Sequence, residues 1–276
     1  MRLLVIFALL VLGFPSIMAE VVDSFSKCSD FFIKNEPPEI EGVLKKSVSQ
    51  DEDRYKLICQ KYDGQYRFAT LYDIREKIPV FSAYKFTAIY KKNPHIPWMI
   101  EPQLEPLDGE MSEPGANQAV PGDYWNQKTL DRGHLFPNSH AADEINAEST
   151  YTQTNSVPQE SSFNSGSWKL TEQSVRELMN SNCRDQNNKI LAYVLTGAVP
   201  GNTRLNNRVN IPSYMWTVFC CYNAKLKAWE SKAYWAENKK EKDPKPIDAK
   251  TVEELEDFLW KKFKKSSLLS DDCYAL

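Results

Sequence analysis

The sequence has little of what marks several common classes of protein. It contains only three histidines, and no His-Glu-x-x-His or comparable spacing joins them, so a zinc enzyme is not expected. It contains no Cys-x-x-Cys pair, which argues against a metal site built from thiolates. Beyond Leu12, no apolar run is long enough to cross a bilayer core of about 30 Å, so no membrane contact is expected. There is also no Asn-x-Ser/Thr acceptor for N-glycosylation and no internal repeat.

The chain also lacks a net positive charge. Its 276 residues include 34 Lys and Arg against 37 Asp and Glu, a formal net charge of −3. Proteins that bind nucleic acid over a broad surface usually carry a net positive charge. If this protein binds a polyanion, the positively charged surface must therefore be local. With 42% hydrophobic residues and 12% aromatics, the chain has enough apolar material for a core, and disorder is not expected.

The N-terminus predicts the compartment. Arg2 precedes an apolar run from Leu3 to Leu12, and Gly13, Pro15, Ser16 and the small residue Ala19 follow. A positive start, a short apolar core and a small-residue exit are typical of a secretory signal peptide. We therefore expect residues 1–19 to be a signal peptide and the mature protein to be secreted and extracellular, while its oligomeric state is left open.

Six cysteines follow this segment. An even number of cysteines in an oxidising compartment predicts up to three disulfides, and the sequence leaves their pairing open. The neighbours Cys220 and Cys221 cannot easily bond each other, so we expect them to tie one segment of the chain to two others. The full set is Cys28, Cys59, Cys183, Cys220, Cys221 and Cys273.

Strand and helix patterns interleave without a clear linker, which predicts one α+β domain. We expect this domain to span residues 66–276, with residues 20–65 as an N-terminal arm packed on it. Residues 101–123 are rich in proline and glycine and are expected to form a surface loop. Periodicity and residue type predict a hairpin at 66–90, strands at 190–199, 209–222 and 228–234, and helices at 168–181 and 251–263.

One group of residues carries the parts for a specific chemistry. Residues 131–134 read Asp-Arg-Gly-His, and Asn164 follows thirty residues after His134. Glu172 and Arg176 then follow at helical spacing, one turn apart. Together they supply a base, a neutral oxygen ligand, a carboxylate and guanidinium groups. This set predicts metal-assisted cleavage of a phosphodiester.

Each part has a physical role in such a reaction. Hydrolysis of a phosphodiester needs a nucleophilic water, neutralisation of charge on phosphorus and a proton for the leaving oxygen. The imidazole of His134, with an ordinary pKa of about 6.5, can accept a proton near neutral pH. The amide oxygen of Asn164 suits a hard cation such as Mg²⁺, whose waters Glu172 could hold. The planar guanidinium groups of Arg132 and Arg176 could each donate two hydrogen bonds to phosphate oxygens.

In isolation, each residue has a plainer interpretation. His95 and His140 are expected to be ordinary surface or core residues rather than bases. Glu172 and Arg176 alone would be a common i,i+4 helix pair, and Asn164 alone could begin a helix as its N-cap. Other basic residues are expected to be solvated surface, namely Arg204, Arg208 and the lysines of residues 239–250 and 261–265.

Longer blocks resemble a known family. Residues 124–137, Tyr-Trp-Asn-Gln-Lys-Thr-Leu-Asp-Arg-Gly-His-Leu-Phe-Pro, resemble the signature of the DNA/RNA non-specific endonucleases with a ββα-metal active site. Residues 154–159, and residues 164–168 with Glu172, continue that family's pattern in the right order. The resemblance extends from about residue 68 to residue 222.

The resemblance implies a fold and a set of roles. The implied fold is α+β, a central, mainly antiparallel sheet flanked by helices, with a ββα finger that carries His134 on a strand and Asn164 on a helix. It implies His134 as general base, Asn164 as ligand of Mg²⁺ or of another divalent cation such as Mn²⁺, and DNA and RNA as substrates. Asn155 is implied as a substrate-binding residue, and Asp131 as a catalytic residue that positions the loop or His134. The remaining catalytic residues implied are Arg132, Glu172 and Arg176.

Two departures from the family pattern concern basic residues that would bind the substrate. Many members have a lysine where Thr217 follows Trp216 here, and for an arginine upstream of the tetrad only Arg67 and Arg75 are loose candidates. We expect a secreted, Mg²⁺-dependent endonuclease that cuts DNA and RNA with little sequence preference. The alternative is a catalytically weak extracellular nucleic-acid-binding protein on the same scaffold.

Overall fold

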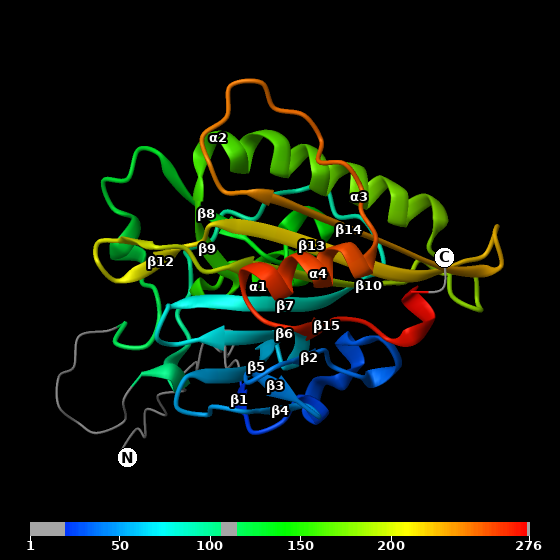
Figure 1. The fold of residues 1–276 in the computed structure, drawn as a ribbon, viewed down its shortest axis with the longest axis horizontal. Coiled ribbons are helices and arrows are strands. Elements are labelled where there is room, and N and C mark those ends of the chain that lie inside the picture. Colours follow the sequence, from blue (N-terminus) through cyan, green and yellow to red (C-terminus); the bar gives the residue numbers. More distant parts are fainter. Residues whose placement is uncertain (1–19, 106–114, 275–276) are drawn as a thin grey trace, which may run out of the picture.

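A seven-stranded antiparallel sheet forms the centre of the protein (Figure 1). The computed structural model describes residues 20–105 and 115–274, so the predicted signal peptide lies outside the described residues. Across the sheet, the strands lie in the order β1-β5-β6-β7-β10-β13-β14. In that order they span Glu20–Val22, Tyr55–Tyr62, Gln65–Asp73, Ile78–Phe86, Ala192–Val199, Tyr214–Asn223 and Ala228–Glu237.

Smaller elements surround this sheet. Two small sheets have two strands each: β8 with β9 (Leu130–His134, Ser156–Glu160) and β11 with β12 (Thr203–Leu205, Val209–Ile211). A small sheet has the order β15-β2-β3-β4 (Ser266–Ser267, Glu39–Ile40, Leu44–Lys45, Val48–Ser49). The helices are α1 (Glu144–Ser149), α2 (Ser161–Phe163), α3 (Lys169–Asn182) and α4 (Val252–Lys262). Within the described ranges, none of the helices combines the length and apolar character needed to pass through a bilayer.

The predicted α+β class is confirmed. Most of the predicted elements are present, but the strand predicted at 209–222 is two strands, β12 and β13, in different sheets. The hairpin predicted at 66–90 is β6 with β7, paired from Ala69 and Ala83 to Asp73 and Ile78. The helix predicted at 168–181 is α3, and the capping box of Thr251 opens α4. Residues 20–65, predicted to be an arm, supply β1 and β5 to the central sheet itself.

Both faces of the central sheet are covered, because successive side chains of a strand point to opposite faces. On one face, Leu195 and Val218 pack with Leu255 of α4. On the other face, Val194 packs with Val175 of α3. Figure 1 shows the two helices on different sides of the sheet. The long, continuously apolar pattern of β7 and β10 follows from this double coverage.

The same alternation explains the adjacent cysteines. Cys220 and Cys221 follow each other on β13 and belong to the cores on opposite faces of the sheet. Each can therefore bond only a partner on its own side. Three disulfides result, as predicted in number, and the adjacent pair ties one strand to two other segments: Cys28–Cys59, Cys183–Cys221 and Cys220–Cys273.

Candidate active site

A ββα unit carries the predicted site residues. Strands β8 and β9 form a two-stranded antiparallel sheet in which His134 pairs with Ser156. Helix α2 follows β9 directly, and the chain then makes one wide π turn, Asn164–Trp168, before α3 begins. His134 thus lies at the end of a strand and Asn164 in the helical part, as predicted.

Asp131 fixes the side chain of Asn164. Its Oδ2 atom accepts a hydrogen bond from Asn164 Nδ2 at 2.9 Å, and its Oδ1 atom accepts one from Ser161 Oγ at 2.7 Å. The contact uses the amide nitrogen of Asn164, so the amide oxygen remains available as a ligand. Asn164 has helical backbone angles and does not act as an N-cap, so that alternative is wrong.

His134 lies among aromatic rings. Its ring centroid is 4.7 Å from that of Trp98 and 4.9 Å from that of Tyr151. Burial lowers the pKa of His134 to about 4, so the ring is neutral at ordinary pH. Its Nε2 atom is buried and has no hydrogen-bond partner. A neutral imidazole is the form that a general base requires.

An open cavity of about 640 Å³ lies along α3. It is lined by Asn164, Glu172 and Arg176, together with Lys169 and Asn138. Burial raises the pKa of Glu172 to about 8, while the nearby Lys169 and Arg176 oppose this rise only in part. The i,i+4 pair is therefore more than a solvated helix pair, because both side chains face the cavity that Asn164 lines.

Asn138 connects His134 with this cavity. The Asn138 amide nitrogen donates to the Tyr151 hydroxyl at 2.8 Å, and the Tyr151 ring stands edge-on to the ring of His134. Asn138 also lines the same cavity as Asn164. A short chain of contacts thus leads from the candidate base to the candidate ligand.

Arg132 shares the face of β8 with His134, two residues away. Its guanidinium carbon lies 4.5 Å from the ring centre of Tyr124 and 5.6 Å from that of Trp98. One terminal nitrogen donates to the carbonyl of Pro121 at 2.8 Å. Desolvation by burial lowers the pKa of Arg132. The group is held beside the base by two aromatic rings.

Asn155 does not reach the surface. Its side chain is fully buried; the amide oxygen accepts from Ser82 Oγ and from the backbone N–H of Phe136, both at 2.9 Å. Its amide nitrogen donates to the carbonyls of Phe136 and Thr150. With every donor and acceptor occupied, the side chain has no group left for a substrate, and it holds the segment that follows His134.

Threonine occupies the position of the family lysine. Thr217 is 6% exposed on β13 and shares a hydrogen bond of 2.9 Å with Thr196 of β10. In the strand register, Thr196 faces Ser82 of β7, which in turn bonds Thr70 of β6. A row of buried hydroxyls therefore crosses the sheet beneath the ββα unit, and this row supplies no charge.

His140 is a buried structural residue, as the sequence predicted when it was not assigned as a base. It is 2% exposed, and each ring nitrogen has a partner at 2.9 Å. Nδ1 bonds the Tyr84 hydroxyl of β7, and Nε2 bonds the backbone carbonyl of Glu172. His140 therefore connects the central sheet to the helical turn from which Glu172 projects. His95, the other histidine that was expected not to act as a base, is exposed.

The two predictions about solvated arginines had different outcomes. Arg208 is only partly exposed: its Nε donates to Asp123 at 2.9 Å and its Nη2 to the carbonyl of Gly115 at 2.8 Å. Arg204 is exposed, as predicted, and donates to Glu76 at 2.6 Å. Arg208 thus ties the β11–β12 hairpin to the loop before the tetrad, and Arg204 ties it to the turn between β6 and β7. The described ends of that loop carry buried polar residues such as Asp123, so it is only partly a surface loop.

Sequence reasoning missed the segment that supports the π turn. Glu241 Oε1 accepts from the backbone N–H of Ser167 at 2.7 Å, and Oε2 accepts from Ser167 Oγ at 2.6 Å. Gly166 has non-helical angles there (φ −103°, ψ −116°), and a Cβ at Gly166 would lie 2.9 Å from Pro244. The lysines around Glu241 are exposed, as predicted, but the backbone of this segment holds the turn that carries Asn164. No local pattern signals that contact.

The donors at the site suit a hard divalent cation. Asn164 offers an amide oxygen whose nitrogen is fixed by Asp131, and Glu172 offers a carboxyl group in the same cavity, whose raised pKa of about 8 a bound cation would lower. In the part of the chain that the structure describes, no three His, Cys, Asp or Glu side chains gather as a metal-binding group. Mg²⁺ commonly keeps several waters and takes few protein ligands, so an amide oxygen with a nearby carboxylate fits it.

Comparison with known proteins agrees with these features. Residues 55–266 match the family described as DNA/RNA non-specific endonuclease. This chain belongs to that family. The tetrad at 131–134, Asn164, Glu172 and Arg176 all fall within the matched region.

Two similar proteins come from mammals. The human endonuclease domain-containing 1 protein is 30% identical over 230 residues, which cover 78% of this chain and 43% of the human protein. The mouse endonuclease domain-containing 1 protein is 30% identical over 211 residues, which cover 71% of this chain and 39% of the mouse protein. The match thus covers less than half the length of these relatives.

A solved structure shares the fold. A chain in the crystal structure of the EndoG/EndoGI complex aligns with a TM-score of 0.56 at 19% identity, over 70% of this chain and 81% of that one. The predicted fold class, a large antiparallel sheet flanked by helices with a ββα unit, is confirmed.

Proposed function

We propose that this chain is a secreted endonuclease that needs a divalent cation, Mg²⁺ or Mn²⁺, and hydrolyses phosphodiester bonds of DNA and RNA. One observation carries the proposal: Asp131 holds the amide nitrogen of Asn164, which leaves its oxygen beside a cavity that Glu172 and Arg176 also line. The neutral His134 on the same ββα unit supplies the base. Family membership supports the nuclease chemistry.

His134 takes the proton from the attacking water. Its Nε2 atom is buried under the aromatic rings, so Nδ1 is the nitrogen that we assign to this transfer. Trp98 and Tyr151 restrict the tilt of the ring. A positioned base of this kind contributes about 10²- to 10⁴-fold to a rate.

The remaining side chains hold and neutralise the substrate. Asn164 would hold the cation through its amide oxygen, and Glu172 would hold the cation's waters. When bound, the cation would neutralise phosphate charge and favour proton transfer to the leaving oxygen. Arg176 and Lys169 face the cavity, and Arg132 lies beside His134, so each can neutralise phosphate charge. Contacts of this type recognise phosphate and not bases, so little sequence preference is expected.

Secretion rests on two independent features. The pattern at residues 1–19 is that of a signal peptide. All six cysteines form disulfides, which persist in oxidising compartments and are rare in the cytosol. Expression in cultured cells, with the medium and lysate probed separately, tests this part: retention of the folded protein in the lysate would contradict it.

Cleavage of plasmid DNA and of RNA tests the nuclease activity. We expect cleavage with Mg²⁺, none with EDTA, and a loss of about 10²- to 10⁴-fold in His134→Ala. His95→Ala is the matched control, because His95 is exposed and should leave the rate unchanged. Undiminished cleavage by His134→Ala would overturn the role of His134.

One observation favours the second candidate, a catalytically weak nucleic-acid-binding protein. Thr217, buried and bonded to Thr196, stands in place of a family lysine and supplies no positive charge. Binding of nucleic acid without cleavage in Mg²⁺, Mn²⁺ or Ca²⁺ would support this candidate.

A further inference from the structure

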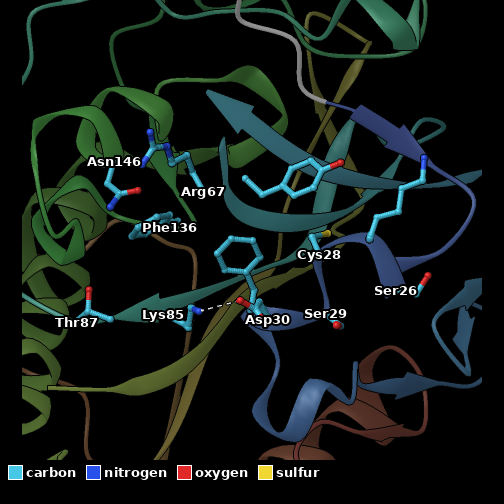
Figure 2. Close-up of a pocket in the computed structure, with 12 residues that line it drawn as sticks. Ser26, Cys28, Ser29, Asp30, Arg67, Lys85, Thr87, Phe136 and Asn146 are labelled. Atoms are coloured by element: carbon cyan, nitrogen blue, oxygen red, sulfur yellow. Dashed lines mark ion pairs between the residues drawn. The ribbon is translucent and has the colours of Figure 1, made fainter. Parts of the chain in front are cut away.

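A second cavity, separate from the candidate active site, lies where five segments meet. Its volume is about 460 Å³, and it shares no lining residue with the cavity along α3. Its walls come from the 3₁₀ turn Phe25–Phe31, from β6, from the end of β7, from the segment after β8 and from α1 (Figure 2). Because the walls come from all over the chain, no short sequence motif marks this cavity.

Positive charge dominates the lining. Lys27, Arg67 and Lys85 line the cavity, and Asp30 is the one acid among its lining residues. The Asp30 carboxylate lies 3.5 Å from the Lys85 ammonium, and its side chain is 81% exposed, so that pair is weak. Figure 2 shows this pair at the lower edge of the pocket, with Arg67 across from it. In a protein of net charge −3, this is a local positive field.

Arg67 is the most available of these cations. Its Nε atom donates to the carbonyl of Tyr62 at 3.1 Å, which fixes the base of the guanidinium. In the described part of the chain, no carboxylate lies within ion-pair distance of Arg67, and its two terminal nitrogens have no hydrogen-bond acceptor. A guanidinium held in this way can present two parallel N–H groups to a phosphate. Lys27, by contrast, is paired with Glu20 at 3.0 Å.

Neutral groups complete a lining suited to a phosphate ester. The hydroxyls of Ser26, Ser29 and Thr87 and the amide of Asn146 can donate to phosphate oxygens. Figure 2 shows Asn146 next to Arg67. Three aromatic residues also line the cavity: Phe31, Tyr66 and Phe136.

The cavity adjoins the candidate base through the chain. Phe136, which forms one wall, follows His134 by two residues, a separation of at most about 7 Å along an extended chain. The candidate base and this wall of the cavity therefore lie on one short segment of the chain. On the basis of the proposed function, we propose that the cavity binds a phosphate of the nucleic-acid strand away from the bond that is cut.

Binding without cleavage tests this site. In the His134→Ala full-length protein, Arg67→Gln combined with Lys85→Gln should weaken binding of a fluorescent 20-nucleotide single-stranded DNA by at least about fivefold. The slope of log affinity against log salt should become shallower by about 0.7 for each phosphate that the variant no longer neutralises. The matched control is Lys225→Gln with Lys227→Gln, two exposed lysines of the β13–β14 turn, which should leave both values unchanged.

Three outcomes decide the proposal. Equal affinity and slope in the cavity variant and the control variant would overturn it. Competition by adenosine monophosphate as strong as by the 20-nucleotide strand would also overturn it, because the cavity would then serve free nucleotides. If the Arg67 substitution lowers thermal stability, Lys85→Gln alone should still reduce the slope.

The outcomes for cleavage are independent of these. A wild-type protein that cuts DNA, with cavity variants that bind normally, would refute only the cavity. A wild-type protein that fails to cut, with cavity variants that bind weakly, would refute only the endonuclease.

Discussion

Acid should destabilise this protein partly through His140, which contacts Tyr84 and the backbone of Glu172 through its two ring nitrogens. Burial lowers the pKa of His140 to about 4, against an ordinary value of 6.5. The unfolded chain therefore binds a proton as the pH falls below about 6.5, while the folded protein does not until about pH 4. Stability is lost across this window and is unaffected above it.

The magnitude follows from the difference between the two pKa values. At about 1.36 kcal/mol per pKa unit, the full loss below pH 4 is about 3.4 kcal/mol, and between pH 7 and pH 5 it is about 2 kcal/mol. Substitution of His140 by Gln removes the titrating group and keeps an amide donor for the carbonyl of Glu172. His134, whose pKa is lowered in the same direction, is present in both proteins, so its contribution cancels in the comparison.

The assay is urea unfolding at pH 7 and pH 5. The free energy of unfolding should fall by about 2 kcal/mol more in the parent than in His140→Gln. His95→Gln, at an exposed histidine, should behave like the parent. An equal fall in the parent and in His140→Gln would refute the reasoning, because His140 would then titrate alike in both states.

Three further substitutions test the support of the ββα unit. Asp131→Ala removes two hydrogen bonds and should weaken Mn²⁺ binding, measured by electron paramagnetic resonance, about tenfold; unchanged binding would mean that Asn164 is held by other contacts. Glu241→Ala frees the π turn and should also weaken Mn²⁺ binding, while Glu241→Gln, which retains acceptors, should recover part of it. Gly133→Ala places a methyl group against Gln159, whose Cβ would lie 2.8 Å away, and should cost about 1–3 kcal/mol of unfolding free energy by calorimetry; an unchanged melting temperature would contradict this.

Local patterns were sufficient to predict part of the secondary structure, but not β1 and β5, which lie in the segment expected to be an arm. Alternation and β-branched residues gave β6 and β7, and a capping box from Thr251 gave the start of α4, because both signals act within a few residues. The adjacent Cys220 and Cys221 predicted a strand tied to two segments. Their partners Cys273 and Cys183 required knowledge of which face each side chain occupies.

Contacts between distant segments set the rest of the site. The burial of Asn155 could not be predicted, because its four hydrogen bonds come from β7 and from both sides of the loop after β8. The ion pair of Arg208 with Asp123 joins positions 85 residues apart in the sequence, so no local pattern indicates it. Trp98, in a proline-rich stretch, gave no sign that it would pack on the ring of His134.

The central claim is that His134 and Asn164 form a cation-dependent phosphodiesterase site, and cleavage of supercoiled plasmid by the purified protein tests it most directly. We predict nicking in Mg²⁺ that stops with EDTA, and a loss of about 10²-fold or more in both His134→Ala and Asn164→Ala. The His95→Ala control should cut at the wild-type rate. Cleavage that persists in EDTA, or that survives both substitutions, would contradict the claim.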